Sequence, residues 1–97
     1  MKSYIPSPLD TSDVTLPKEL DELSELLSRH VHEVWCRSRI NNGWSYGVSR
    51  NDELKETPCI VPYDDLSEEE KGYDRITTQE TLKLIIKLGF KISKNQI

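Results

Sequence analysis

Apolar residues recur at a helical spacing through the first half of the chain. Leucines and valines stand three or four residues apart between positions 20 and 34, which places them on one face of an α-helix. This apolar stripe consists of Leu20, Leu23, Leu27, Val31 and Val34. Acidic residues precede it, arginines follow it, and Asn41-Asn42-Gly43 suits a left-handed helix end. The pattern predicts a helix from about Lys18 to Ile40, with the stripe in the core.

The C-terminal half contains two capping-box patterns. Residues Ser67 to Glu70 form the first, and predict a short helix that fades near Gly72. Residues Thr77 to Glu80 form the second, and predict a helix over about 78–88. Gly89 is a suitable left-handed residue to follow that helix.

The remaining segments have no helical period. Cys59-Ile60-Val61 and Phe90-Lys91-Ile92 are short apolar or alternating runs, so we expect brief strands there. Residues 1–17 contain three prolines and several turn-forming residues, which favour an extended arm. We expect this arm to pack on the core because it contains Tyr4, Ile5, Leu9, Val14 and Leu16. The pattern as a whole predicts one mainly α (α+β) domain over residues 1–97.

Composition narrows the function classes. The 97 residues include 13 basic and 17 acidic ones, so the chain lacks the positive charge that duplex nucleic acid attracts. No run approaches the roughly 20 apolar residues that span a bilayer, and no signal-peptide pattern opens the chain. The two cysteines, Cys36 and Cys59, are too few for a secreted disulfide framework. We therefore expect a cytoplasmic protein with free thiols.

A second row of side chains runs beside the apolar stripe of the first helix. Ser28, His32, Trp35 and Arg39 follow one another at spacings of four, three and four. We expect Trp35 to lie half-buried at the margin of the core, where an indole flanked by cationic groups suits a flat anionic ligand. The plainer interpretation is that Trp35 fills the core and Arg39 is a solvated cation.

Three further candidates follow the first helix. Gly43 and Gly47 bracket a tight turn that contains Trp44 and Tyr46, and Arg50 comes shortly after it. The two aromatic residues either cap the end of the core or extend the binding surface. Arg50 either pairs with an acidic neighbour or holds an anion.

The sequence contains no catalytic or metal-binding constellation. His32 and Cys36 are one helical turn apart, but a structural zinc site needs four ligands at recognisable spacing. The pair also lacks a predictable orienting group of the kind that activates a nucleophile. We therefore expect no enzyme activity, no metal and no cofactor.

Together these segments resemble the ryanodine-receptor repeat (RyR) domain from about Tyr4 to Ile92. The resemblance rests on residues 6–11, 14–17, 32–35, 39–40, 43–47 with Arg50, 58–63 with Leu66, 70–71, 73–75, 80–83 and 88–90. Departures are small: Thr57 stands where the family often has His, and Asn51-Asp52 where it often has two Asp. Because the chain has one repeat and no channel, it resembles the short, stand-alone members of the family found in bacteria and phages.

The resemblance implies a fold with a long N-terminal helix, a shorter C-terminal helix and short antiparallel strands. It implies no enzyme activity and no channel. Because tandem repeats of the family pack about a pseudo-twofold axis, it implies a homodimer. The family's tandem form can hold an adenine nucleotide, with a tryptophan at the position of Trp35 stacked on the ligand.

The residues and the resemblance together predict a small non-enzymatic ligand-binding module, with nucleotide sensing as the implied role. Its aromatic pocket around Trp35 would be completed by a second copy, and its ligand would be an adenine-type nucleotide or another small planar molecule. The candidate ligand-binding residues are Trp35, His32, Arg39, Trp44, Tyr46 and Arg50. We expect no duplex nucleic acid and no membrane as partner. The alternative is a protein–protein interaction domain that uses the same aromatic surface. A concave pocket near arginine would favour the first hypothesis, and a flat apolar patch the second.

Overall fold

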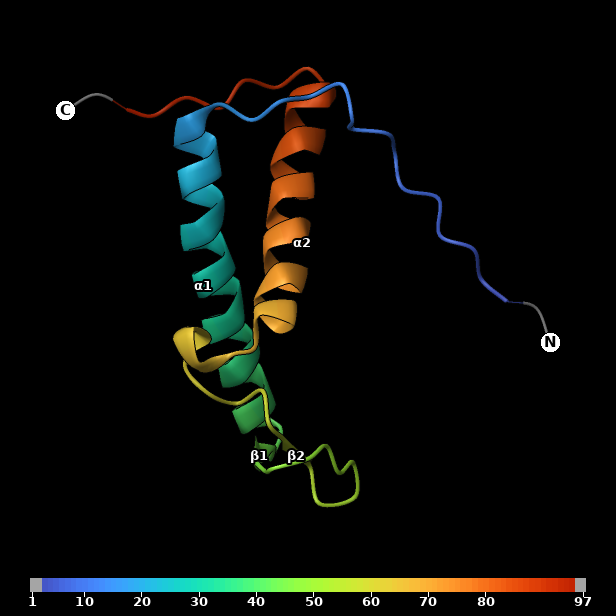
Figure 1. Ribbon diagram of the computed structural model, residues 1–97, viewed down its shortest axis with the longest axis vertical. Coiled ribbons are helices and arrows are strands. Elements are labelled where there is room, and N and C mark those ends of the chain that lie inside the picture. The colour runs from blue at the N-terminus through green and yellow to red at the C-terminus, as the bar shows by residue number, and fades with distance from the viewer. Residues whose placement is uncertain (1–2, 96–97) are drawn as a thin grey trace.

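Two long helices lie side by side and antiparallel, and a small sheet lies at one end of the pair (Figure 1). The computed structural model describes residues 3–95. The elements in chain order are α1 (Lys18–Asn41), β1 (Ser45–Tyr46), β2 (Glu56–Thr57), the 3₁₀ turn η1 (Tyr63–Asp65) and α2 (Glu68–Lys87). The mainly α fold class with short strands is thus confirmed.

Helix α1 matches the prediction at both ends. It closes with a Schellman motif, in which the Gly43 N–H donates to the Ile40 carbonyl and the Trp44 N–H donates to the Arg39 carbonyl. Gly43 has φ +91°, a conformation that strains any residue with a Cβ. The left-handed helix end expected at Asn41-Asn42-Gly43 is therefore confirmed.

Helix α2 corrects the prediction of two helices in the C-terminal half. Ser67 caps it as expected, because its hydroxyl accepts the Glu70 N–H at 3.2 Å. The helix then continues through Gly72, where a glycine costs only about 1 kcal/mol relative to alanine. Thr77 lies inside the helix, and its hydroxyl donates to the Tyr73 carbonyl at 2.9 Å instead of capping a new helix.

The strands differ from the prediction in position and direction. They lie at Ser45–Tyr46 and Glu56–Thr57, whereas Cys59–Val61 and Phe90–Ile92 form no strand. The pairing is parallel, not antiparallel. The chain reverses twice between the strands, the second time at a turn closed by the Asn51–Glu56 bridge, so β2 runs in the direction of β1. A Cβ at Gly47 would lie 2.6 Å from the Glu56 Cβ, so a glycine is required at this close approach.

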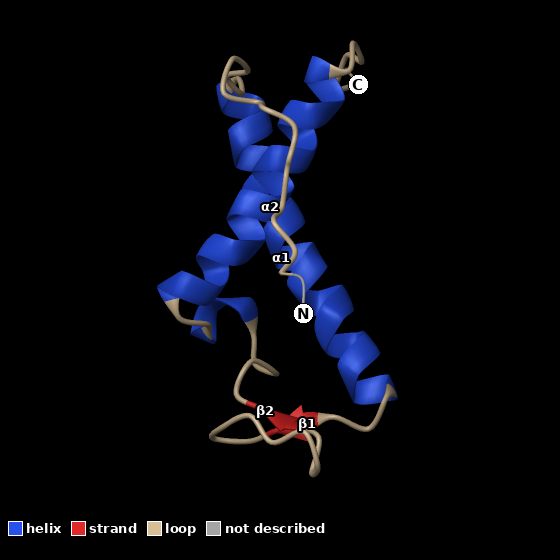
Figure 2. Cartoon of the chain, turned by 90° about the vertical axis from the view of Figure 1, so that its right-hand side faces the viewer, coloured by secondary structure: helices blue, strands red, loops and turns tan. Residues whose placement is uncertain are grey.

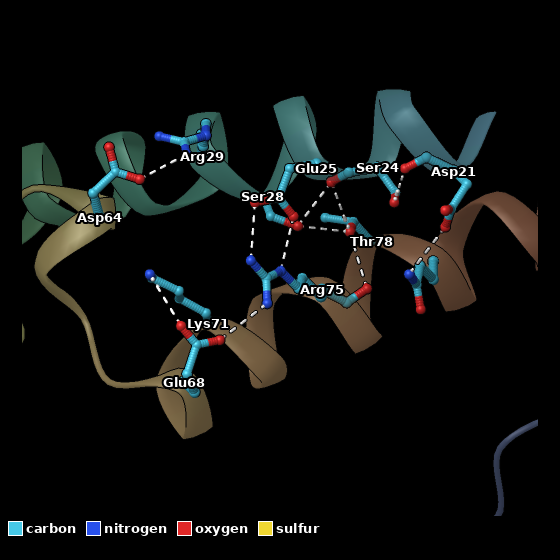
Figure 3. Close-up of polar contacts among 11 residues, drawn as sticks. Asp21, Ser24, Glu25, Ser28, Arg29, Asp64, Glu68, Lys71, Arg75 and Thr78 are labelled. Atoms are coloured by element: carbon cyan, nitrogen blue, oxygen red, sulfur yellow. Dashed lines mark hydrogen bonds and ion pairs between the residues drawn. The ribbon is translucent and has the colours of Figure 1, made fainter. Parts of the chain in front are cut away.

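The buried side chains of α1 are polar, whereas four of the five stripe residues are only half-buried, which corrects the prediction that the apolar stripe forms the core. The residues of α1 that are buried are Ser24, Ser28 and His32. The Ser28 and Thr78 hydroxyls lie 3.0 Å apart, and the Thr78 hydroxyl donates to the Ser24 carbonyl at 3.2 Å (Figure 3). Small hydroxyl side chains suit this contact between α1 and α2, because they allow the two helices to approach closely and form hydrogen bonds with one another.

An ion pair reinforces one flank of the helix contact. The Arg75 guanidinium makes two hydrogen bonds to the Glu25 carboxylate, at 2.8 and 3.1 Å (Figure 3). This pairing holds the pKa of the Glu25 carboxyl below its ordinary value. This ion pair therefore joins α1 and α2 beside the buried hydroxyl groups of Ser28 and Thr78.

The N-terminal arm is packed on the helices over part of its length. The Thr11 side chain is buried and its hydroxyl donates to the Glu80 carboxylate. Before it, Tyr4, Ile5 and Leu9 are exposed, so the expectation that they lie on the core is wrong; Figure 1 shows this part leading away from both helices. Val14 and Leu16 are half-buried. Met1 and Lys2 lie outside the described residues. Within residues 3–95, neither helix has the length and hydropathy needed to cross a membrane.

Candidate functional site

Five of the six predicted site residues form one continuous stack near the end of α1. The His32 and Trp35 rings are stacked with centroids 5.9 Å apart. The Arg39 guanidinium carbon lies 5.4 Å from the Trp35 centroid and 5.6 Å from the Trp44 centroid. The Arg50 guanidinium carbon lies 5.5 Å from the Trp44 centroid. Aromatic and cationic groups thus alternate along this aromatic row, at distances typical of cation–π contacts.

The row is built by the helix and by the way the helix ends. Trp35 and Arg39 are four residues apart on α1 and therefore lie one above the other. The Schellman motif folds the chain back, so that Trp44 reaches the same Arg39 side chain. The sheet lies at this end of the helix pair, as Figure 2 shows, and the loop between its strands contains Arg50.

His32 anchors the buried end of the row. Its side chain is 4% exposed, and Nε2 donates to the Val61 carbonyl at 2.7 Å. The Cys36 Sγ lies 3.4 Å from the same nitrogen. This bond fixes the ring plane, and the His32 ring in turn orients Trp35.

The outer end of the row is exposed. Arg50 also pairs with Asp52 at 2.8 Å, in a fully accessible position, which agrees with the plainer interpretation of this residue as well as with a role in the row. Tyr46 belongs to β1 and is 54% exposed. It makes none of the ring contacts found for the other five candidates among the described residues.

A cavity of about 230 Å³ opens beside Trp35. We call it the Trp35 cavity; it lies where α1, α2 and the segment between β2 and α2 meet. Its walls are Val31, His32, Trp35, Cys59, Leu66, Glu70 and Asp74. Trp35 is half-buried at this margin, as predicted. The site is therefore concave and has an arginine next to its aromatic wall.

The sequence did not single out the two acidic residues of this cavity as site residues. Glu70 was assigned to a capping box, and Asp74 follows it by four residues, so both lie on the same face of α2. Burial raises the pKa of the Asp74 carboxyl above its ordinary value, while the nearby His32 has the opposite, smaller effect. The spacing of four residues was enough to place Glu70 and Asp74 on one face of a helix. That this face points toward Trp35 depends on how α2 packs on α1.

The two thiols nearest the cavity are poor nucleophiles. Cys36 and Cys59 are both free and half-buried. Burial is the main cause that raises the pKa of each thiol, with acidic neighbours acting in the same direction. A raised pKa leaves less thiolate, the reactive form, near neutral pH. Across residues 3–95, no three histidine, cysteine or acidic side chains converge as metal ligands would.

A long helix, a shorter antiparallel helix and a two-stranded sheet define a small α-rich domain with a concave, aromatic candidate site at one end. The chain belongs to the RyR domain family, whose profile matches residues 4–94. This match confirms the resemblance inferred from the sequence motifs. It covers all six candidate site residues, and the departures at Thr57 and Asn51-Asp52 do not interrupt it.

Proposed function

We propose that this chain is a small, non-enzymatic ligand-binding module that holds a planar ring in the cavity beside Trp35. The observation that supports it most is the concave Trp35 cavity, with Arg39 in contact with the same indole. A flat apolar patch at this place would have favoured the alternative of a protein-binding surface. The raised pKa values of the Cys36 and Cys59 thiols support a non-enzymatic role.

The charges around the site suggest how a nucleotide would lie in it. Among the described residues that line the Trp35 cavity, the carboxyl groups are those of Glu70 and Asp74. Carboxylates accept hydrogen bonds and repel anions, so they suit a ring edge with N–H groups, such as an amino-bearing base. Arg39 and Arg50 lie along the row beyond Trp35, where they suit phosphate. An adenine-type nucleotide meets both requirements.

The size of the cavity supports a site completed by a second copy. Pockets that bury a small-molecule ligand usually measure about 300–1,000 Å³. The 230 Å³ beside Trp35 is below this range and accommodates a base more readily than a whole nucleotide. A homodimer would supply the missing wall. The two free cysteines fit a reducing compartment, which supports our proposal of a cytoplasmic location.

Thermal denaturation with ATP, ADP, ADP-ribose and cyclic nucleotides tests the proposal, with tryptophan fluorescence recorded in parallel. A ligand that binds only the folded state raises Tm in a saturable way, and contact with Trp35 changes its emission. Trp35→Ala should abolish both effects while far-UV circular dichroism shows the helices intact. Tyr46→Ala is the matched control, since Tyr46 lies outside the row, and should leave both effects unchanged.

Two results would count against the proposal. If no nucleotide shifts Tm or changes fluorescence in the unmodified chain, the Trp35 cavity is not a nucleotide site. If Trp35→Ala unfolds the chain, Trp35 is a core residue and the plainer interpretation holds.

The exposed side chains near β1 support a second candidate function, a protein–protein interaction domain. Tyr46 is 54% and Val48 88% exposed, close to the aromatic row. Tyrosine, tryptophan and arginine are the residues that most often dominate protein interfaces. On this hypothesis Tyr46→Ala weakens partner binding, whereas on the first hypothesis it leaves ligand binding unchanged.

A further inference from the structure

The apolar stripe of α1 is only partly covered in the single chain, where Leu20, Leu23, Leu27 and Val34 are half-buried. None of its five members is among the buried residues, and Val31 is 42% exposed. Leu26, next to the stripe, is 64% exposed. A helix usually buries its apolar face, because removing apolar surface from water is the main favourable contribution to folding.

A groove follows the N-terminal part of this stripe. It has a volume of about 540 Å³, and its apolar walls are Leu20, Leu23 and Leu26 of α1 with Ile92 of the C-terminal tail. The tail reaches this place because it crosses back to the N-terminal end of α1 after α2 (Figure 1). The groove thus lies between two segments of the chain, and Glu19, Glu22 and Lys94 line it beside the apolar residues.

The single chain has a small core for its length. Among residues 3–95 the buried apolar side chains are Tyr63, Leu66 and Leu82. The other buried side chains are polar: Thr11, Ser24, Ser28, His32, Thr57 and Thr78. Most of the other leucine, isoleucine and valine side chains among the described residues are half-buried or exposed, so a second chain could bury more of them.

The exposed area has the size that a dimer interface would cover. The chain exposes 7982 Å², whereas a compact monomer of 11.3 kDa exposes about 5,700 Å². The radius of gyration is 16.6 Å, against about 12.5 Å for a compact chain of this length. The exposed arm of residues 3–10 contributes part of the excess, and the partly covered helix face contributes another part. The excess is about 2,300 Å², of which a standard-size dimer interface requires about 800 Å² from each copy.

We propose that the apolar stripe and the groove beside it form the interface with a second copy of this chain. A straight stripe on a 24-residue helix can pack against the same stripe about a twofold axis, each copy meeting the other with the same residues. Val31 belongs to the stripe and also lines the Trp35 cavity, so a copy seated on the stripe reaches the edge of that cavity. This inference identifies the surface for the second copy on which the proposed function rests.

Leu26→Lys tests the interface with little risk to the fold, because the side chain is already 64% exposed. Leu54→Lys is the matched control: Leu54 is 66% exposed and lies in the loop between β1 and β2. Light scattering coupled to size-exclusion chromatography gives the mass, and circular dichroism checks that each variant is folded. We expect a dimer for the unmodified chain and for Leu54→Lys, and a folded monomer for Leu26→Lys.

Two outcomes would overturn the inference. One is an unmodified chain that is monomeric and folded at every concentration tested. The other is a Leu26→Lys variant that remains a dimer, which would move the interface elsewhere. Failure of the ligand proposal is recognised separately, because Trp35→Ala removes the proposed ring contact and leaves the apolar stripe intact. A dimer that binds no nucleotide would support this inference and contradict the proposed function.

Discussion

The Arg39 guanidinium lies between two indoles, 5.4 Å from the Trp35 centroid and 5.6 Å from the Trp44 centroid. Contact with two rings removes part of the hydration of the cation, and cation–π attraction holds its position. Because the guanidinium has already lost part of its hydration, binding an anion requires the removal of less water. At the residue scale, this is the strongest support for the proposal that the row meets an anionic group next to a ring held in the Trp35 cavity.

Asp74 is an acidic residue of the Trp35 cavity, and its carboxyl group makes the stability of the fold depend on pH. Its pKa is raised by burial, so the folded state favours the protonated carboxyl more than the unfolded state does. Stability therefore falls as the pH rises from the ordinary carboxyl pKa through the raised one. Asp74→Asn, which stays neutral, should raise the free energy of unfolding at neutral pH and leave it nearly unchanged at low pH.

Urea denaturation of both proteins at neutral and low pH measures this difference. Glu33→Gln on the exposed side of α1 is the control, since it removes a carboxylate from an accessible position. A stabilising effect of Asp74→Asn that is equal at both pH values would contradict the role of burial. The prediction concerns the free protein, so no ligand is added.

At the scale of elements, the contact between the two helices includes buried hydroxyl groups that lie outside the apolar stripe of α1. Thr78 donates to the Ser24 carbonyl and lies 3.0 Å from the Ser28 hydroxyl, which is fully buried. Thr78→Val keeps the shape of the side chain but removes both contacts, which leaves the Ser28 hydroxyl bonded only to the Ser24 carbonyl, at 2.8 Å, within this buried cluster. We expect a loss of about 0.5–1.5 kcal/mol in the free energy of unfolding.

Thr81→Val is the matched control on the same helix. The Thr81 side chain is exposed, and its hydroxyl donates only to the Thr77 carbonyl one turn earlier. Its substitution should change the free energy of unfolding by less than about 0.5 kcal/mol. Equal losses for both variants, measured by urea denaturation, would show that the contact between the helices does not depend on the buried hydroxyls.

The same contact shows how far the sequence can predict the fold. The spacing of the apolar stripe located α1 correctly, because a helical period depends on the helix alone. The face that packs on α2 depends on the partner, and Ser24 and Ser28 could be assigned to it only once Thr78 was known to lie opposite. Local capping signals succeeded at Ser67 and Gly43 and failed at Thr77, where the helix was already formed.

The candidate site was predictable to a similar degree. His32, Trp35 and Arg39 share one helix face, so their spacing was enough to group them. Trp44 joins them through the Schellman motif, whose glycine was visible in the sequence. Asp74 is more than thirty residues away on α2, and only the packing of the helices brings its carboxyl to the cavity.

At the scale of the whole molecule, a flat chain with principal extents of 47 × 45 × 23 Å has little interior of its own. If a second copy covers the apolar stripe, association adds to the stability of the folded chain. The melting temperature must then rise with chain concentration, because mass action favours the folded dimer. Each tenfold increase contributes about 1.4 kcal/mol, which corresponds to roughly 3–6 °C for a dimer of this size.

Differential scanning calorimetry over a hundredfold range of concentration measures this dependence. Leu54→Lys should behave like the unmodified chain, whereas Leu26→Lys should melt at a lower temperature that does not change with concentration. A constant melting temperature in the unmodified chain would show that one copy folds without help. The apolar stripe of α1 would then need another partner, and the Trp35 cavity would have to bind its ligand with the walls that a single chain provides.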